Sequence, residues 1–156
     1  MAKFMKITLL LVIAPATIVD CIEESGIEGR GPILDKVYFL GVEKLSWYAA
    51  SFYCEKSGWK LVTIESARDQ ANLMQFLSYY NINDRGYWSA GNRLSNDVDW
   101  RWGFESEEMN YTNWQNTDQQ CQCVDTSDCV KLVERNLRWK GEDCFAELDF
   151  ICQKNI

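Results

Sequence analysis

The chain carries side chains that could support acid–base chemistry, but it lacks their usual partners. Its 156 residues include no histidine, which excludes Ser-His-Asp and Cys-His catalysis. Two acid pairs, Glu107-Glu108 and Glu142-Asp143, could imitate the two carboxylates of a glycosidase. Adjacent acids are far more often solvated surface, and the chain has no phosphate loop or dinucleotide fingerprint. The sequence therefore predicts a protein that is not an enzyme.

Cysteine supplies the other reactive chemistry, and its pattern indicates disulfides. In a small secreted chain this number of cysteines is typical of bridges, and cleavage just after Cys21 would leave an even number. Cys121-Gln122-Cys123 could form a bridge to a partner chain or a tight local bridge. A zinc site is discounted, because histidine is absent and zinc needs four suitably spaced ligands. The seven cysteines are Cys21, Cys54, Cys121, Cys123, Cys129, Cys144 and Cys152.

Residues 1–21 have the pattern of a signal peptide. Lys3 and Lys6 form a positively charged start. They precede an apolar run, Ile7 to Ile13, that is too short to span a bilayer. The alternative is a buried N-terminal helix, but Pro15 ends the run and polar residues follow. No later segment is apolar enough to cross a membrane. We therefore expect a secreted, extracellular protein without membrane insertion, whose mature chain starts near Ile22.

The charge balance is acidic. The formal net charge is −7, and loss of Lys3, Lys6 and Asp20 with the signal peptide changes it to −8. An acidic protein without a basic stripe binds nucleic acid poorly, and anionic membranes repel it. Nucleic acid and membranes are therefore not expected partners.

Both expected helices lie in the first half of the chain, each preceded by an expected strand. Residues 22–35 are polar and glycine-bearing, and we expect them to be a flexible lead-in to one domain over residues 36–156. Residues 36–40 and 60–64 have the composition of strands. Ser46 is a good N-cap for a helix that Gly58 would end. Ser66 and Asp69 resemble the capping box of a second helix.

Tryptophans in the second half stand in short segments between Asn, Asp, Gly and Ser, a pattern typical of strands and long loops. Helices followed by strands suggest an α+β fold.

Several short motifs also occur in a definite order. Together they resemble the C-type lectin-like family, especially its small secreted insect members, over roughly residues 36–153. No single motif is specific for the family, but six motifs in this order and with sensible spacing are highly specific for it. The motifs are Trp47-x-x-Ala50-x-x-x-Cys54, Leu61-Val62-Thr63-Ile64-Glu65-Ser66, Tyr87-Trp88-Ser89-Ala90-Gly91, Asn113-Trp114, Cys129-Val130-Lys131-Leu132 with Trp139 and Cys144, and Phe150-Ile151-Cys152.

The resemblance implies the C-type lectin-like fold, with two helices, short antiparallel sheets and a long irregular loop region. It also implies two bridges, Cys54 to Cys152 and Cys129 to Cys144. The first would close nearly a hundred residues and remove about 4–5 kcal/mol of unfolded-state entropy.

In this family a sugar usually binds through Ca²⁺ held by side-chain oxygens, and the counterparts here are depleted. Asp118 and Gln120 keep an oxygen each, but Gln119 replaces a cis-proline between them. Ser127 stands where a Glu is expected, and Lys140 and Gly141 replace an Asn-Asp pair. The Lys140 ammonium would repel the ion. Asp118, Gln120, Ser127, Lys140 and Gly141 are called the calcium position below. We expect no Ca²⁺ there, and no other metal or cofactor.

The alternative is a shifted Ca²⁺ site in the same region. It would use acids from the set Asp118, Asp125, Asp128, Glu142 and Asp143.

Any remaining ligand surface would be the 115–128 loop and its neighbours. Tyr111, Trp114 and Trp139 could stack on a sugar there, although core packing is the favoured interpretation. Asn110-Tyr111-Thr112 is an N-glycosylation acceptor, which would make this a glycoprotein.

The sequence thus predicts a secreted recognition protein that binds a carbohydrate or a protein, with a glycan or glycoprotein as its expected partner. By resemblance its setting is innate immunity or reproduction. The alternative is a module without sugar affinity that has a structural or partner-regulating role, such as a disulfide-linked dimer.

Overall fold

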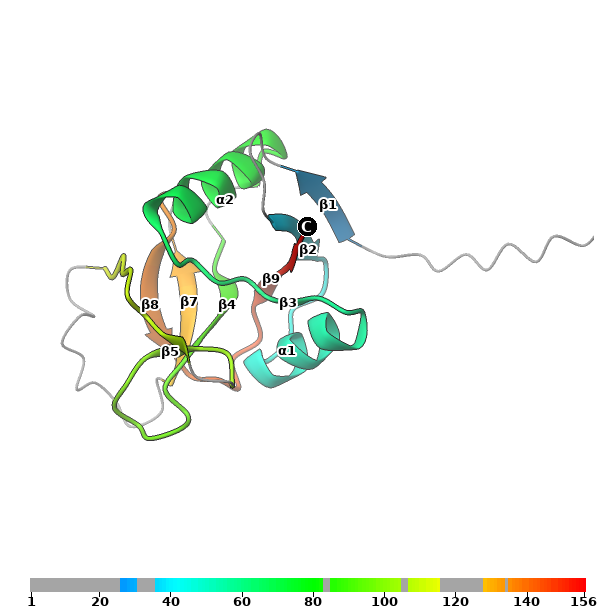
Figure 1. Ribbon diagram of the computed structural model, residues 1–156. Coiled ribbons are helices and arrows are strands. Elements are labelled where there is room, and N and C mark those ends of the chain that lie inside the picture. The colour runs from blue at the N-terminus through cyan, green and yellow to red at the C-terminus, as the bar shows by residue number, and fades with distance from the viewer. Residues whose placement is uncertain (1–25, 31–35, 83–84, 105–106, 116–127, 134) are drawn as a thin grey trace, which may run out of the picture.

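The computed structural model describes residues 26–30, 36–82, 85–104, 107–115, 128–133 and 135–156 (Figure 1). Within these ranges there are two helices, α1 (Trp47–Lys56) and α2 (Ala67–Tyr79). Neither helix is long and apolar enough to cross a membrane. The strands are β1 (Gly26–Arg30), β2 (Lys36–Gly41), β3 (Lys60–Leu61), β4 (Tyr87–Asn92), β5 (Arg101–Trp102), β6 (Glu107–Glu108), β7 (Cys129–Val133), β8 (Arg138–Glu142) and β9 (Asp149–Asn155).

The strands form a mixed sheet in which β2 and β9 lie side by side (Figure 1). β2 pairs antiparallel with β9, from Lys36 opposite Asn155 to Leu40 opposite Ile151. β9 also pairs with β3 and runs parallel to β4. β4 continues to β5 and β7, β5 pairs with β6, and β7 pairs with β8. The predicted α+β class is confirmed.

Strand β1 lies inside the segment 22–35, for which the sequence suggests a flexible lead-in. All five of its residues pair with β2, from Gly26 opposite Gly41 to Arg30 opposite Val37. The lead-in prediction is therefore wrong for these five residues. Glycine is depleted in strands, so the local pattern hides a strand whose hydrogen bonds come from the neighbouring β2.

The first helix begins and ends where the sequence indicates. The Ser46 hydroxyl accepts a hydrogen bond from the Ala49 backbone N–H at 3.3 Å. Gly58, just past the helix end, has φ of +74°, a conformation that glycine adopts without steric cost. The buried face of α1 carries Trp47, Ala50, Ser51 and Cys54.

The second helix is capped by Ser66, whose hydroxyl accepts from the Asp69 N–H at 3.1 Å. The Asp69 carboxylate accepts from the Glu65 N–H at 3.0 Å. Leu73, Phe76 and Leu77 are buried against the sheet. The predicted second helix and its capping serine are thus present.

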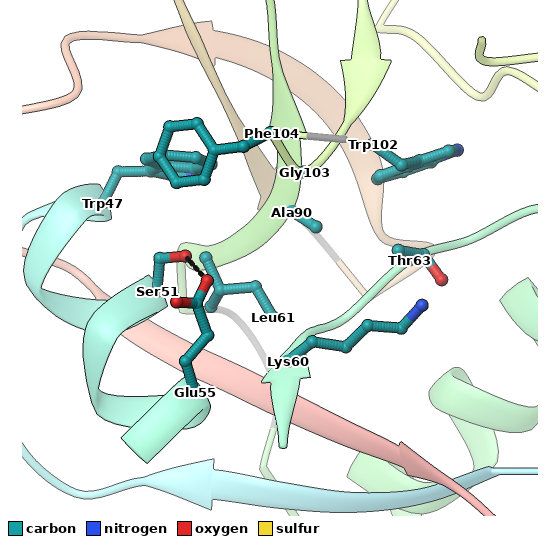
Figure 2. A pocket seen from close by; sticks show the side chains of 10 residues that line it. All are labelled: Trp47, Ser51, Glu55, Lys60, Leu61, Thr63, Ala90, Trp102, Gly103 and Phe104. Atoms are coloured by element: carbon teal, nitrogen blue, oxygen red, sulfur yellow. Dashed lines mark hydrogen bonds between the residues drawn. The ribbon is translucent and has the colours of Figure 1, made fainter. Parts of the chain in front are cut away.

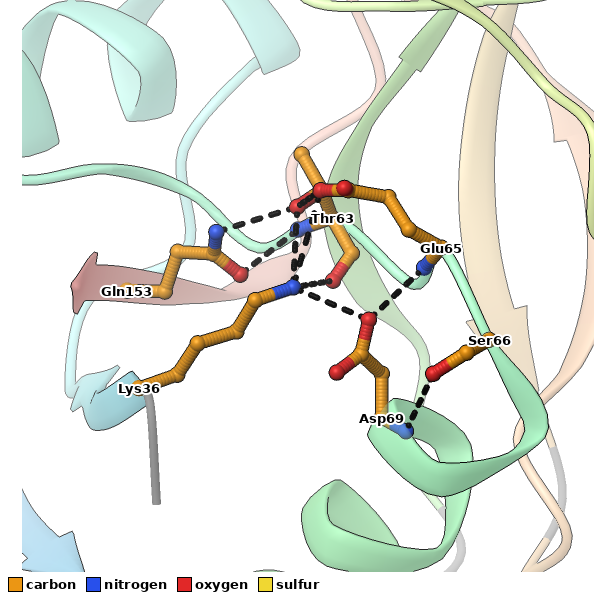
Figure 3. A network of polar contacts seen from close by, with 6 residues as sticks. All are labelled: Lys36, Thr63, Glu65, Ser66, Asp69 and Gln153. Atoms are coloured by element: carbon orange, nitrogen blue, oxygen red, sulfur yellow. Dashed lines mark hydrogen bonds and ion pairs between the residues drawn. The ribbon is translucent and has the colours of Figure 1, made fainter.

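Strand β3 is shorter than the predicted 60–64 strand, although the Val62 N–H still donates to the Ile151 carbonyl at 2.8 Å. At Thr63 a side chain takes the place of the backbone partner. The Gln153 side chain, fully buried, accepts from the Thr63 N–H at 2.9 Å and donates to the Thr63 hydroxyl at 3.0 Å (Figure 3). Lys36 forms an ion pair with Asp69, with its Nζ 3.0 Å from the Asp69 Oδ2. This network joins β2, the segment after β3, α2 and β9 (Figure 3).

Tryptophans and bridges hold the centre of the domain. Trp47 and Trp88 are fully buried, and their indole N–H groups donate to the carbonyls of Ser89 and Leu45, each at 2.8 Å. The structure joins Cys54 to Cys152, which ties α1 to β9, and Cys129 to Cys144, which ties β7 to the segment after β8. These are the two pairs that the resemblance implies.

Candidate ligand-binding site

The calcium position is only partly described. Asp118, Gln120 and Ser127 lie outside the described residues, as do Cys121 and Cys123. The other two positions lie on β8, where Lys140 is opposite Lys131 and Gly141 is opposite Val130.

The Lys140 side chain is exposed, and Gly141 contributes no side chain. This part of β8 therefore presents an ammonium at the position where the sequence resemblance implies oxygen ligands.

Glu142, the nearest acid on β8, is already engaged. Its carboxylate forms an ion pair with Lys131 and accepts from the Asp143 N–H at 3.1 Å. Burial raises the pKa of Glu142, but the hydrogen bonds from Lys131 and Asp143 and the charges of Lys131 and Lys140 outweigh it. The net result is a pKa below the ordinary value of 4.5. Glu142 is thus a charged carboxylate that Lys131 and Lys140 stabilise.

The other described acids of the shifted-site hypothesis also have partners. Asp128 accepts from the Arg93 Nε at 2.8 Å, and Asp143 accepts from the Phe145 N–H at 2.9 Å. Among the described residues, no three His, Cys, Asp or Glu side chains are grouped so as to hold a metal ion. Asp118 and Asp125 lie outside these residues.

The three aromatic candidates near the calcium position pack on one another. Trp139 is fully buried, with its ring centroid 5.5 Å from Trp114 and 5.9 Å from Tyr111. The Gln115 N–H donates to the Trp139 carbonyl at 3.0 Å. Trp139 is therefore a core residue, while Tyr111 and Trp114 are half-buried. Asn110, the predicted glycosylation site, is exposed.

A separate pocket of about 490 Å³ lies between α1, β3 and β5 (Figure 2). We call it the α1–β3 pocket. Its polar side chains come from α1 and from the β3 segment, and its aromatic rings come from α1 and from β5 and the turn after it. The residues that line it are Trp47, Ser51, Glu55, Lys60, Leu61, Thr63, Ala90, Trp102, Gly103 and Phe104.

No local sequence pattern indicates the α1–β3 pocket. Its residues belong to segments far apart along the chain, and each carries an ordinary local signal. Trp47 reads as a helix core residue, and Lys60 as an exposed strand residue. Only the packing of α1 against the sheet brings them together.

The fold and these sites define a disulfide-bonded binding domain. The family model for the lectin C-type domain matches residues 43–154. The chain belongs to this family, which consists of non-enzymatic domains for recognition of carbohydrate or other ligands.

Curated relatives of this chain come from several animal groups. A perlucin-like protein of Mytilus galloprovincialis is 26% identical over 117 residues, 74% of each chain. The C-type lectin mosGCTL-7 of Aedes aegypti is 25% identical over 116 residues, 70% of this chain and 76% of that one. Human lymphocyte antigen 75 is 26% identical over 112 residues, 72% of this chain, but the match spans only 6% of that protein. A mollusc, an insect and a human relative are thus about equally similar, and the narrower insect assignment stays a prediction.

Solved structures share the fold at low sequence identity. A calcium-independent type II antifreeze protein has a TM-score of 0.67 and 19% identity, over 81% of this chain and 92% of that one. This likeness concerns the fold alone.

Proposed function

We propose that this protein is a secreted recognition protein that binds a glycan or glycoprotein ligand without Ca²⁺ at the calcium position. Family membership gives the ligand-recognition role. Calcium independence and secretion are proposed here in addition to that role.

One observation carries the proposal, namely the charge on β8. Ca²⁺ takes six to eight oxygen ligands, mostly from carboxylates and carbonyls. Lys140 brings an ammonium to this position, and Glu142 is paired with Lys131. A cation bound here would lie beside the Lys140 ammonium, and Glu142 could ligate it only by giving up its ion pair with Lys131. These donors do not fit Ca²⁺.

A member of this fold can exist without the ion. The solved antifreeze protein described above is calcium-independent. This supports the idea that the fold does not itself require Ca²⁺, which leaves the present chain free to use other surfaces.

The bridges support secretion. Disulfides form and persist in oxidising compartments, and the structure joins two pairs, Cys54 with Cys152 and Cys129 with Cys144. Together with the signal-peptide pattern of residues 1–21, they favour an extracellular protein.

An array of immobilised oligosaccharides, read in Ca²⁺ and again in EDTA, tests the proposal. We expect the same glycans to be bound at similar strength in both buffers. Binding that EDTA abolishes would contradict calcium independence. Binding to none of the glycans in either buffer would contradict glycan recognition and favour the structural or partner-regulating module.

A further inference from the structure

We infer that the α1–β3 pocket binds one saccharide unit of the ligand, without a metal ion; this inference rests on the proposed function. The pocket is built on α1, β3 and β5, whereas Lys140 and Gly141 lie on β8 (Figures 1 and 2). It is therefore a different site from the calcium position.

The size of the pocket suits a small ligand. Its volume of about 490 Å³ lies within the range of roughly 300–1,000 Å³ that is usual for small-molecule sites. The buried side chains of Leu61 and Ala90 form part of its wall.

Polar groups of opposite character stand on two sides of the pocket (Figure 2). On the α1 side the Glu55 carboxylate accepts from the Ser51 hydroxyl at 3.0 Å. On the β3 side lie the Lys60 ammonium and the Thr63 hydroxyl (Figure 2). Lys60 forms no ion pair or hydrogen bond with another side chain that the structure describes.

A saccharide hydroxyl matches this arrangement, because it both donates and accepts hydrogen bonds. A carboxylate only accepts and an ammonium only donates. Hydroxyls of one sugar ring can therefore donate to Glu55 and accept from Lys60. The two charges are of opposite sign, so the pocket does not demand a charged ligand.

Aromatic rings supply the apolar part of the lining. Trp47 and Phe104 lie with ring centroids 5.2 Å apart, and Trp102 lines the pocket beside them (Figure 2). Phe104 is 60% exposed, so part of its ring is open to a ligand in the pocket. The C–H face of a sugar ring would cover such a surface.

The walls are held in place before any ligand binds. The Trp47 indole donates to the Ser89 carbonyl at 2.8 Å, and the Gly103 N–H donates to the Ala90 carbonyl at 2.8 Å. The Cys54–Cys152 bridge ties α1 to β9. A preformed site loses less conformational freedom on binding.

Three single variants test the inference: Lys60→Ala, Glu55→Gln and Phe104→Ala. All three side chains are exposed, so the variants should fold, and thermal unfolding checks this. Matched controls are Lys44→Ala, Glu43→Gln and Val98→Ala, whose side chains are exposed and do not line the pocket.

The probes are oligosaccharides ending in mannose, galactose or N-acetylglucosamine, titrated in EDTA by calorimetry. For every probe that binds, we expect each pocket variant to raise Kd about tenfold, which corresponds to the loss of one charged hydrogen bond or one apolar contact. The controls should stay within about twofold, well below that change. The Trp102 indole N–H signal in the NMR spectrum should shift when the probe is added.

The other outcomes separate the two proposals. Binding in EDTA that survives in all three pocket variants but is lost in Lys140→Ala would place the site on β8; this overturns the inference and leaves the proposed function intact. Binding that needs Ca²⁺, or no binding of any probe, would overturn the proposed function and the inference with it.

Discussion

Lys131 and Lys140 lie directly opposite each other across the β7–β8 ladder. Like charges in this position destabilise a sheet, and the Glu142 carboxylate offsets them by pairing with Lys131. This part of the β7–β8 ladder thus places two ammonium groups around one carboxylate. A divalent cation beside Lys140 would be repelled by its ammonium.

Millimolar Ca²⁺ should not stabilise the protein measurably. A ligand that binds only the native state adds RT ln(1 + [L]/Kd), about 2.7 kcal/mol at a hundredfold excess over Kd. With Lys140 on β8 we expect Kd well above the millimolar range and no shift in the melting temperature. The triple change Lys140→Asn, Gly141→Asp and Ser127→Glu should restore part of the response. If Ca²⁺ raises the melting temperature of the unmodified protein and EDTA reverses the rise, a shifted site exists.

Glu142→Gln should lower stability at neutral pH but not in acid. The folded-state pKa of Glu142 is below its ordinary value of 4.5, so its carboxylate contributes stability above about that pH. The contribution is lost as the pH falls through the lower folded-state pKa. Melting temperatures of the two proteins should therefore differ at pH 7 and converge as the pH falls below the folded-state pKa of Glu142. Glu147→Gln, an exposed acid, serves as the control. A difference in melting temperature that persists in acid would mean that loss of the ion pair does not cause the destabilisation.

Removal of the Cys54–Cys152 bridge should cost more stability than removal of Cys129–Cys144. The two bridges span 98 and 15 residues. Loop-closure entropy gives about 4.7 kcal/mol for the longer loop and about 3 kcal/mol for the shorter. Paired Cys→Ala variants unfolded in denaturant measure the difference.

Peptide mapping without reduction checks the pairing itself. Finding Cys129 bridged to Cys121 or Cys123 would contradict it.

Gly91→Ala should destabilise the sheet centre by about 1–3 kcal/mol, the usual cost of overpacking. A Cβ at this position would lie 2.6 Å from Val130 Cγ2 and 2.7 Å from Met109 Cε. Gly86→Ala is the matched control, because its added Cβ would meet Leu148 and Lys131 only at 3.9 Å. Equal melting temperatures for both variants would show that β7 can move away from β4 at little cost.

The sequence alone determined the features that depend on residue type at one place. Ser46 and Ser66 cap helices because their hydroxyls satisfy N–H groups within the same turn. The presence of Lys140 and Gly141 where the resemblance implies oxygen ligands is likewise read from residue identity alone, and the absence of Ca²⁺ there stays a prediction. The order of the motifs was enough to indicate the family, because it reflects the whole core rather than any one contact.

Only the tertiary structure decided the features that depend on distant partners. Strand β1 exists through its pairing with β2, and the N–H and hydroxyl of Thr63 bond to the side chain of Gln153, 90 residues away. The α1–β3 pocket unites Ser51, Lys60 and Trp102, none of which carries a local signal for binding. Such contacts are set by how helix and sheet pack, and the energy of that packing is spread over the whole core rather than written in any short stretch of residues.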